Sequence, residues 1–280
     1  MLAVLLALGA ALGWGTADFF GGLKSRSMAM LTVLLVSQAM ALLLLVAILV
    51  SAGEGPPATR FVLYAVVAGL AEGLGVAALY RGLSVGTMSI VAPVSAIAPA
   101  IPLAAGLFLG EVPEPLQSAG LVLIVIGVIL TSRQRGEGVD ASGNLASSIG
   151  YGLVSALGFG IFFVALGVAS EESIPWALFV ARVSAVAALM VAVLVGRSRP
   201  AVKRADLPLL MGMGVLIVAA DAMYAMATTQ GLLSVVAVVG ALHTVVTVAL
   251  ARVCLREQIA AIQRLGVVVS FCGVLMVSAG

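Results

Sequence analysis

The chain has 280 residues, of which 62% are hydrophobic and only 9% are charged. A soluble domain carries about 25% charged residues, so this chain has too few charges to cover a water-exposed surface, and we expect it to lie in a lipid bilayer. Its net charge of +2, without a basic cluster interleaved with aromatic residues, gives no reason to expect nucleic acid as a partner.

Ten apolar stretches follow one another along the chain, each close to the roughly 20 residues that a helix needs to cross a bilayer. The first contains Asp18 and has no basic segment before it, so we expect a retained membrane helix rather than a signal peptide. The sequence predicts an all-α membrane protein with ten transmembrane helices, at residues 2–22, 30–52, 61–80, 88–109, 116–132, 146–168, 174–195, 207–229, 233–251 and 260–278.

The longest polar stretch, residues 133–145, is expected to link two halves of five helices each, residues 1–132 and 146–280. The halves repeat each other in sequence. A shift of 145 residues places the segment from Ala11 to Gly15 on the segment from Ala156 to Gly160.

Two further shifts support this duplication. A shift of 146 residues places Gly120 and Gly127 on Gly266 and Gly273, and one of 149 residues places Glu72 on Asp221. Because each half has an odd number of spans, the second half is expected to be inverted relative to the first. Inverted repeats with a binding site between them are common in secondary transporters.

The basic residues predict the orientation, since cytoplasmic loops are enriched in Lys and Arg. The loops that precede the even-numbered helices are therefore expected to be cytoplasmic, which leaves both termini on the other side. These loops hold twelve of the fourteen basic residues: Lys24, Arg26, Arg81, Arg133, Arg135, Arg197, Arg199, Lys203, Arg204, Arg252, Arg256 and Arg264.

Two carboxylates lie within apolar stretches at matching places in the halves, namely Glu72 and Asp221. A charge at bilayer depth is costly and usually has a function. Each acid is therefore a candidate for carrying a proton or attracting a cationic solute, and for each the alternative is a hydrogen-bonded packing role. Tyr224 follows Asp221 at helical spacing and is expected on the same face.

Arg182 and His243 are two further ionisable residues at the expected membrane depth. Arg182 needs a counter-ion, for which Glu72 and Asp221 are chemically suitable; it forms either a structural pair or a site for a substrate carboxylate. His243 is the only histidine. It is either a packing group or a proton carrier, because imidazole changes its charge near neutral pH.

The first helix carries two candidates, one turn apart. Asp18 is expected to pair with Lys24 or Arg26, or else to lie at the mouth of a cavity. Trp14 is expected either to anchor the helix at a membrane surface or to form an aromatic wall for a substrate.

One motif points to a different class of protein. The segment from Gly82 to Gly86 matches G-x-S-x-G, so Ser84 with His243 could form an intramembrane serine hydrolase. The pattern requires a strand–turn–helix setting, whereas here it falls in a hairpin between membrane helices. The sequence has no nucleotide or metal motif, and Cys254 and Cys272 lack metal-ligand spacing, so no cofactor and no metal are expected.

Several short motifs carry a resemblance to a known family. They are Ala11 to Gly15, Ala77 to Tyr80, Val85 to Ser89, and Leu109-Gly110-Glu111 followed by Gln117, Gly120 and Gly127, which the second half repeats as Leu255-Arg256-Glu257, Gln263, Gly266 and Gly273. Each half resembles the EamA domain, and the whole chain resembles a ten-helix member of the drug/metabolite transporter superfamily.

The resemblance implies a cavity lined mainly by helices one, three, four, six, eight and nine. It therefore implies that Glu72, Asp221 and His243 face this cavity, and it adds Tyr80 to the candidates. The halves also differ, since helix four contains three prolines and helix nine none. We therefore expect helix four to bend and helix nine to be stiffer.

These observations predict a secondary active transporter of the cell (inner) membrane. It would export a small metabolite, such as an amino acid or a related amphiphilic or cationic compound, by alternating access, with proton coupling at Glu72 or Asp221. An uncoupled facilitator or channel is the alternative. The expected partners are the small-molecule substrate, membrane lipid and a proton, and the expected assembly is a monomer or a homodimer. The substrate-binding candidates are Trp14, Asp18, Glu72, Tyr80, Arg182, Asp221, Tyr224 and His243.

Overall fold

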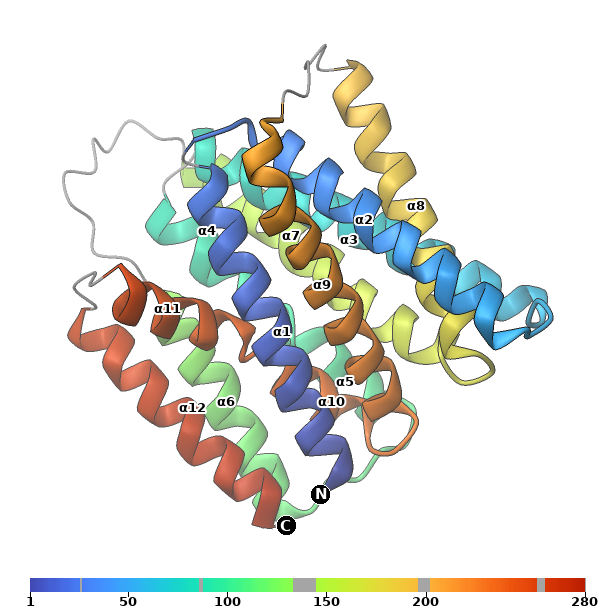
Figure 1. Ribbon diagram of the computed structural model, residues 1–280. Coiled ribbons are helices and arrows are strands. Elements are labelled where there is room, and N and C mark those ends of the chain that lie inside the picture. Colours follow the sequence, from blue (N-terminus) through green and yellow to red (C-terminus); the bar gives the residue numbers. More distant parts are fainter. Residues whose placement is uncertain (26, 86–87, 133–144, 196–201, 256–259, 280) are drawn as a thin grey trace.

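The chain is built from membrane-length helices (Figure 1). The computed structural model describes residues 1–280 apart from 26, 86–87, 133–144, 196–201, 256–259 and 280. Within these residues there is no strand, and ten helical stretches are long and apolar enough to cross a membrane. The prediction of a ten-span all-α membrane protein is confirmed. Residues 133–144 of the predicted linker lie outside the described part.

Most of the spans are single helices, and two are divided. The single ones are α1 (Leu2–Ser25), α2 (Met30–Ala52), α3 (Thr59–Val85), α6 (Pro115–Ser132), α7 (Leu145–Ala169), α8 (Ile174–Val195), α9 (Leu207–Thr228) and α12 (Ala261–Ala279). The divided ones are α4 (Met88–Ser95) with α5 (Ala100–Phe108), and α10 (Leu233–Gly240) with α11 (His243–Cys254). A short 3₁₀ helix, η1 (Arg204–Asp206), precedes α9.

The last helices of the two halves, α6 and α12, cross through reciprocal glycine contacts. A Cβ atom on Gly120 would lie 2.7 Å from the carbonyl oxygen of Gly273, and one on Gly127 would lie 2.7 Å from that of Gly266. Small residues let membrane helices approach closely. Because the earlier glycine of α6 meets the later glycine of α12, these equivalent helices run antiparallel, as an inverted repeat requires.

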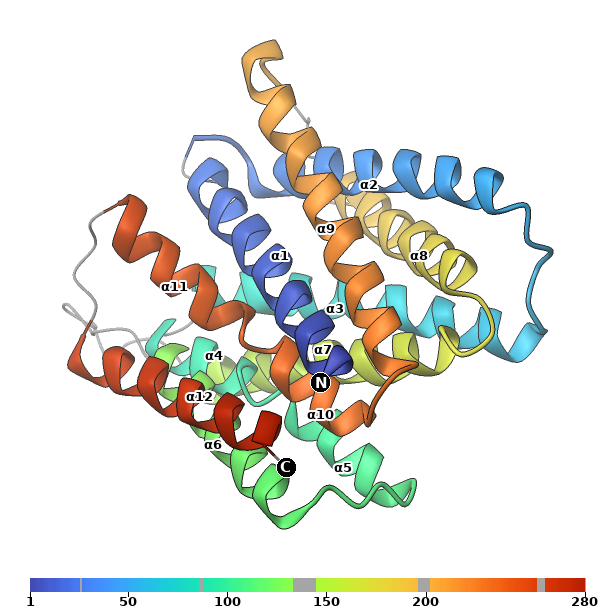
Figure 2. The same cartoon turned by 60° about the horizontal axis from the view of Figure 1, so that its bottom comes forward.

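The remaining packing follows the same twofold pattern. Helix α3 of the first half packs on α7 and α8 of the second half, and its counterpart α9 packs on α1 and α2 of the first half. Helix α7 packs on α4 and α5, while α1 packs on α10 and α11. Figures 1 and 2 show α1 beside α9 and α6 beside α12 from two directions. Each of these contacts between the halves therefore has a counterpart in which the halves exchange roles.

Both divided spans break near their middle, which corrects one expectation. Pro99 interrupts the first, since proline has no N–H to donate and hinders the preceding turn. The second was expected to be stiffer, and that expectation is wrong. Its hydrogen bonds tighten to a 3₁₀ pattern, from the N–H of Leu242 to the carbonyl of Val239 at 3.1 Å. Gly240, a poor helix former, follows a valine-rich segment and supplies the weak point.

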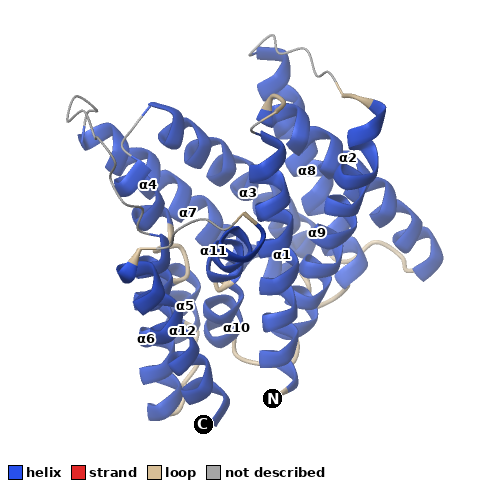
Figure 3. Cartoon of the chain, turned by 60° about the vertical axis from the view of Figure 1, so that its left-hand side comes forward, coloured by secondary structure: helices blue, strands red, loops and turns tan. Residues whose placement is uncertain are grey.

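The two ends of the bundle differ. Both termini lie at one end, which we call the terminal end (Figures 1 and 3). There α5 packs on α10, and Glu111 joins them by accepting hydrogen bonds from the N–H groups of Leu233 at 2.6 Å and Ser234 at 3.0 Å. The counterpart helices at the opposite end, α4 and α11, do not pack comparably within the described residues. The bundle is therefore closed most firmly at its terminal end.

Candidate functional site

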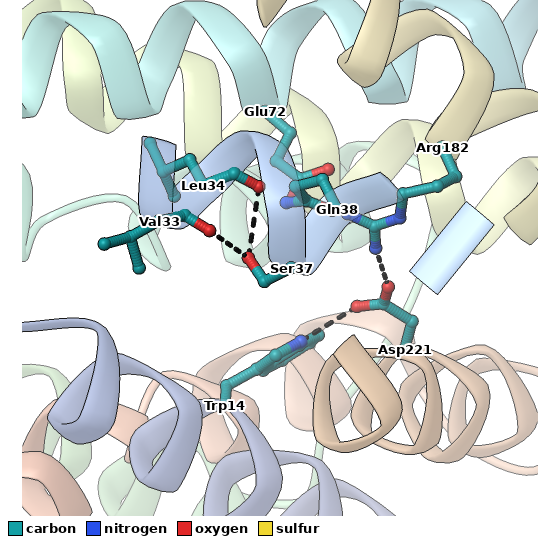
Figure 4. A network of polar contacts seen from close by, with 8 residues as sticks. All are labelled: Trp14, Val33, Leu34, Ser37, Gln38, Glu72, Arg182 and Asp221. Carbon is teal, nitrogen blue, oxygen red and sulfur yellow. Dashed lines mark hydrogen bonds and ion pairs between the residues drawn. The ribbon is translucent and has the colours of Figure 1, made fainter. Parts of the chain in front are cut away.

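A buried cluster of charged and polar side chains joins five helices in the middle of the bundle (Figure 4). At its centre is Arg182 on α8, which is only 3% exposed. Its guanidinium donates hydrogen bonds to Gln38 on α2 and to Asp221 on α9. Its Nη1 also lies 3.5 Å from Oε1 of Glu72 on α3. The predicted counter-ions of Arg182 are therefore both present, but they are not held equally.

Asp221 is the more tightly held carboxylate. One oxygen accepts a hydrogen bond from Arg182, and the other accepts one of 2.8 Å from Nε1 of Trp14 on α1. The residue is 3% exposed, so water has little access to it. Charge-assisted hydrogen bonds on both oxygens make Asp221 the counter-ion of Arg182 in this structure.

Within the described residues, Glu72 is held only by the 3.5 Å contact with Arg182, and its side chain is 16% exposed. It faces a small pocket between α2, α3 and α8. Along each of these helices, most of the residues that line the pocket lie farther from the terminal end than the cluster does. The pocket is lined by Leu34, Gln38, Glu72, Gly73, Val76, Ala185 and Leu189.

The charges of this cluster do not cancel. Two carboxylates face one guanidinium, so with both acids ionised the cluster carries a net charge of −1. An uncompensated charge at membrane depth is costly, and a proton or a cationic group at Glu72 would remove it. The arrangement can therefore hold one exchangeable cation beside the ion pair of Arg182 and Asp221.

Residues at equivalent positions of the two halves form this cluster. Gln38 and Arg182 each stand eight residues after the start of their helices, α2 and α8. Glu72 and Asp221 are the pair already related by the repeat, and Trp14 corresponds to Phe159. The second half thus places a cation where the first has an amide. Because Phe159 has no N–H donor on its ring, Glu72 lacks the bond that Trp14 gives to Asp221.

Gln38 was missed at the level of sequence, since an uncharged polar residue in an apolar helix is a weak signal. Its equivalence to Arg182 could have revealed it. The site also involves the second and seventh spans, α2 and α8, which the family resemblance did not place among the main cavity-lining helices.

An aromatic group supports the cluster from one side. Trp14 packs against Phe162, Phe163 and Tyr224, with ring centroids 5.5 to 6.4 Å apart. Tyr224 is fully buried, and its hydroxyl donates a 2.9 Å hydrogen bond to the carbonyl of Phe163. Tyr224 therefore holds Trp14 in place and has its own hydroxyl already engaged.

A second polar pair lies near Trp14. Nδ1 of His243 is 2.9 Å from Oδ2 of Asp18, and their side chains are 32% and 51% exposed. The expected pairing of Asp18 with Lys24 is wrong, because Lys24 pairs with Asp206 at 2.6 Å. Arg26 lies outside the described residues. The His243 ring meets Trp14 edge-on, so this pair adjoins the buried cluster.

The remaining candidates give less information. Ser84 lies within helix α3, not in a turn after a strand, so the setting of a nucleophile elbow is absent there. The side chains of Ser84 and Tyr80 lie outside what the structure describes, as does Gly86. Among the described residues, no group of three or more His, Cys, Asp or Glu side chains could hold a metal ion.

The fold and the cluster together define a multi-pass membrane protein with two inverted halves around a buried polar site. A sequence profile of the EamA-like transporter family matches residues 1–133 and again residues 146–279. The chain belongs to this family.

Two further comparisons agree in fold or in part of the sequence. A solved crystal structure superposes with a TM-score of 0.77, covering 99% of this chain and 96% of that one at 14% sequence identity, which shows a shared fold. An uncharacterised protein from Methanocaldococcus jannaschii is 42% identical over 74 residues, or 26% of this chain. The chain spans about half the length of that relative, 54%.

Proposed function

We propose that this protein is a secondary active transporter that exports a small cationic or zwitterionic metabolite, such as an amino acid, in exchange for a proton. The observation that carries this proposal is the unequal pair of acids. Asp221 is neutralised by Arg182, whereas Glu72 is loosely held and faces a pocket. A carboxylate in this position can bind a proton or an ammonium group, but not both at once.

The exchange follows from that competition. With the Glu72 pocket open, an ammonium group displaces the proton from the carboxyl of Glu72 and takes its place. After the bundle opens at the terminal end, the solute leaves and a proton from that side makes the cluster neutral again. The cluster is neutral when either the solute or the proton is bound. The conformational change therefore costs less electrostatic free energy in these two loaded states than in the empty, negatively charged state.

The direction of transport rests on the distribution of basic residues. Lys24, Lys203 and Arg204 lie at the end opposite the termini, and cytoplasmic loops are enriched in such residues. We propose that this end is cytoplasmic in the cell membrane and that the termini lie outside. The Glu72 pocket would then load its solute from the cytoplasm. Tags on each terminus, probed in intact cells, test the orientation.

Trp14 and the pair formed by Asp18 and His243 are proposed to contact the solute. The ring of Trp14 offers a flat apolar face, which would suit the apolar part of an amphiphilic solute. Asp18 is half exposed at a depth where a charge facing lipid would be costly. We therefore place it in a water-filled vestibule on the solute's path.

Purified protein in liposomes with a trapped pH indicator tests the proposal. Amino acids, sugars, nucleosides and cationic drugs would be added in turn, and amines are expected to drive proton movement. Glu72→Gln should abolish this coupled movement, while Glu171→Gln, at an exposed turn, should leave it intact. Amine-driven proton movement that survives Glu72→Gln would refute the role of Glu72. Solute counterflow without any dependence on pH would favour an uncoupled facilitator.

A further inference from the structure

The two carboxylates of the cluster are equivalent by the repeat but unequal in this structure. Arg182 is hydrogen-bonded to Asp221 and lies 3.5 Å from Glu72. The same inequality appears in the helices, since α5 packs on α10 whereas the counterpart pair does not pack comparably within the described residues. The ion pair and the helix packing therefore both depart from the twofold symmetry of the repeat in this structure.

The pocket beside Glu72 is asymmetric in the same sense. Its apolar lining includes Leu34, Val76, Ala185 and Leu189. The repeat relates these residues to a set on α8, α9 and α2, which lies along those helices from Arg182, Asp221 and Gln38 toward the terminal end. All four residues of that set are buried: Leu178 at 5%, Ala225 at 0%, Ala41 at 0% and Leu45 at 1% exposure. In the Glu72 pocket Ala185 and Leu189 are buried too, but Leu34 and Val76 are partly exposed, whereas their counterparts Leu178 and Ala225 are not. The counterpart pocket is closed while the Glu72 pocket is present.

We infer that Arg182 is a positioning residue that exchanges its partner between the two states of the transporter. In the state described here it pairs with Asp221, and Glu72 is free to bind a cation. When the bundle opens at the terminal end, Arg182 pairs with Glu72, and Asp221 becomes the free acid in the newly opened counterpart pocket. This inference rests on the proposed alternating access and names the residue that couples the cation to it.

The exchange satisfies the charges in both states. Arg182 always keeps one carboxylate, so no state leaves the guanidinium buried without a counter-ion, which would cost several kcal/mol. Its Nε is buried and has no hydrogen-bond partner among the described residues, so the guanidinium has a donor to spare. Arrival of Arg182 at Glu72 also expels the cation held there, which links release of the cation to the change of state.

A matched pair of cysteine reporters tests the exchange. Val76→Cys lies on the wall of the Glu72 pocket at a partly exposed residue, and Ala225→Cys lies at the buried position that the repeat relates to it. Both would be made after replacing the exposed Cys254 and Cys272 by serine. The rate at which a small, charged thiol reagent labels each position, in detergent, reports which pocket is open.

The two acids should act in opposite directions. In Asp221→Asn, Glu72 is the remaining carboxylate for Arg182, so labelling at position 225 should rise and labelling at position 76 should fall, each by several-fold. In Glu72→Gln, Asp221 is the remaining carboxylate for Arg182. Labelling at position 225 should therefore fall, and labelling at position 76 should rise. A purely structural role would loosen the protein in both variants, and a shift of both in the same direction, or of neither, would overturn the inference.

A milder variant covers the case in which Asp221→Asn does not fold. Glu72→Asp keeps the charge but shortens the reach toward Arg182, so labelling should move as in Glu72→Gln, and an unchanged ratio would overturn the inference. Glu171→Gln serves as the control, with labelling expected as in the wild type. Proton movement in wild-type liposomes tests the transporter function separately. Opposite shifts in labelling without any solute-driven proton movement would therefore support the exchange and refute only the proposed coupling.

Discussion

Removing the cation at the centre of the cluster is the most informative single perturbation. Arg182→Gln would give α8 the side chain that α2 has at the equivalent position. Asp221 would keep only its bond from Trp14, with the carboxyl of Glu72 still in the cluster. Breaking a buried ion pair by removing one partner costs about 3–5 kcal/mol. We expect the free energy of unfolding to fall by about that amount, with protonation of a carboxyl limiting the loss.

A double variant separates lost charge compensation from lost packing. Adding Asp221→Asn to Arg182→Gln removes one of the two carboxylates that have lost their cation, so the double variant should be more stable than Arg182→Gln alone. Unfolding in mild detergent, followed through tryptophan fluorescence, measures both. Arg60→Gln, an exposed cation on α3, is the control and should change stability by no more than about 1 kcal/mol. Arg182 would not compensate the buried carboxylates if Arg182→Gln lowered the free energy of unfolding no more than this control, or if the double variant were the less stable one.

Three further substitutions test the packing around the site. Gly127→Ala should lower the free energy of unfolding by about 1–3 kcal/mol, because its Cβ would lie 2.5 Å from the backbone nitrogen of Ser270; Gly212→Ala, where nothing lies within 4 Å, should be neutral or stabilising in the same thermal scan. Glu111→Ala should cost about 0.5–2 kcal/mol as a lost helix cap, and hydrogen exchange at the first amides of α10 should speed up; unchanged exchange would show that this bond does not hold the terminal end closed. Trp14→Phe should cost about 1.5–3 kcal/mol through the lost hydrogen bond to a carboxylate, and a loss indistinguishable from zero in denaturant unfolding would count against that bond.

The fold could be predicted from the sequence because its main cause is local. A stretch of about 20 apolar residues has few options in a bilayer other than a helix. The reciprocal glycines of α6 and α12 were visible as a repeat before their contact was known. The break in the ninth span was not predicted, since it has no proline, and the weakness at Gly240 appears only in the hydrogen bonds of the folded helix.

The candidate site was predictable in composition but not in pairing. Buried charges at membrane depth identified Glu72, Arg182 and Asp221 as a group. Which acid binds Arg182 depends on distances between helices, which local spacing does not encode. Asp18 illustrates this limit: Lys24 is nearer in sequence, but the folded chain places His243 beside it. Asp221 is held more tightly than Glu72, and this difference is visible only in the contacts that Arg182 and Trp14 make in the folded chain.

Glu72 is proposed to hold the exchangeable proton, and the release of this proton on solute binding can be measured. Purified protein in weakly buffered detergent would be mixed with an amine that drives transport, and a pH indicator would record the protons released. The wild type should release a proton as the amine binds, and Glu171→Gln should do the same. Glu72→Gln should release none, and undiminished release from Glu72→Gln would contradict the account.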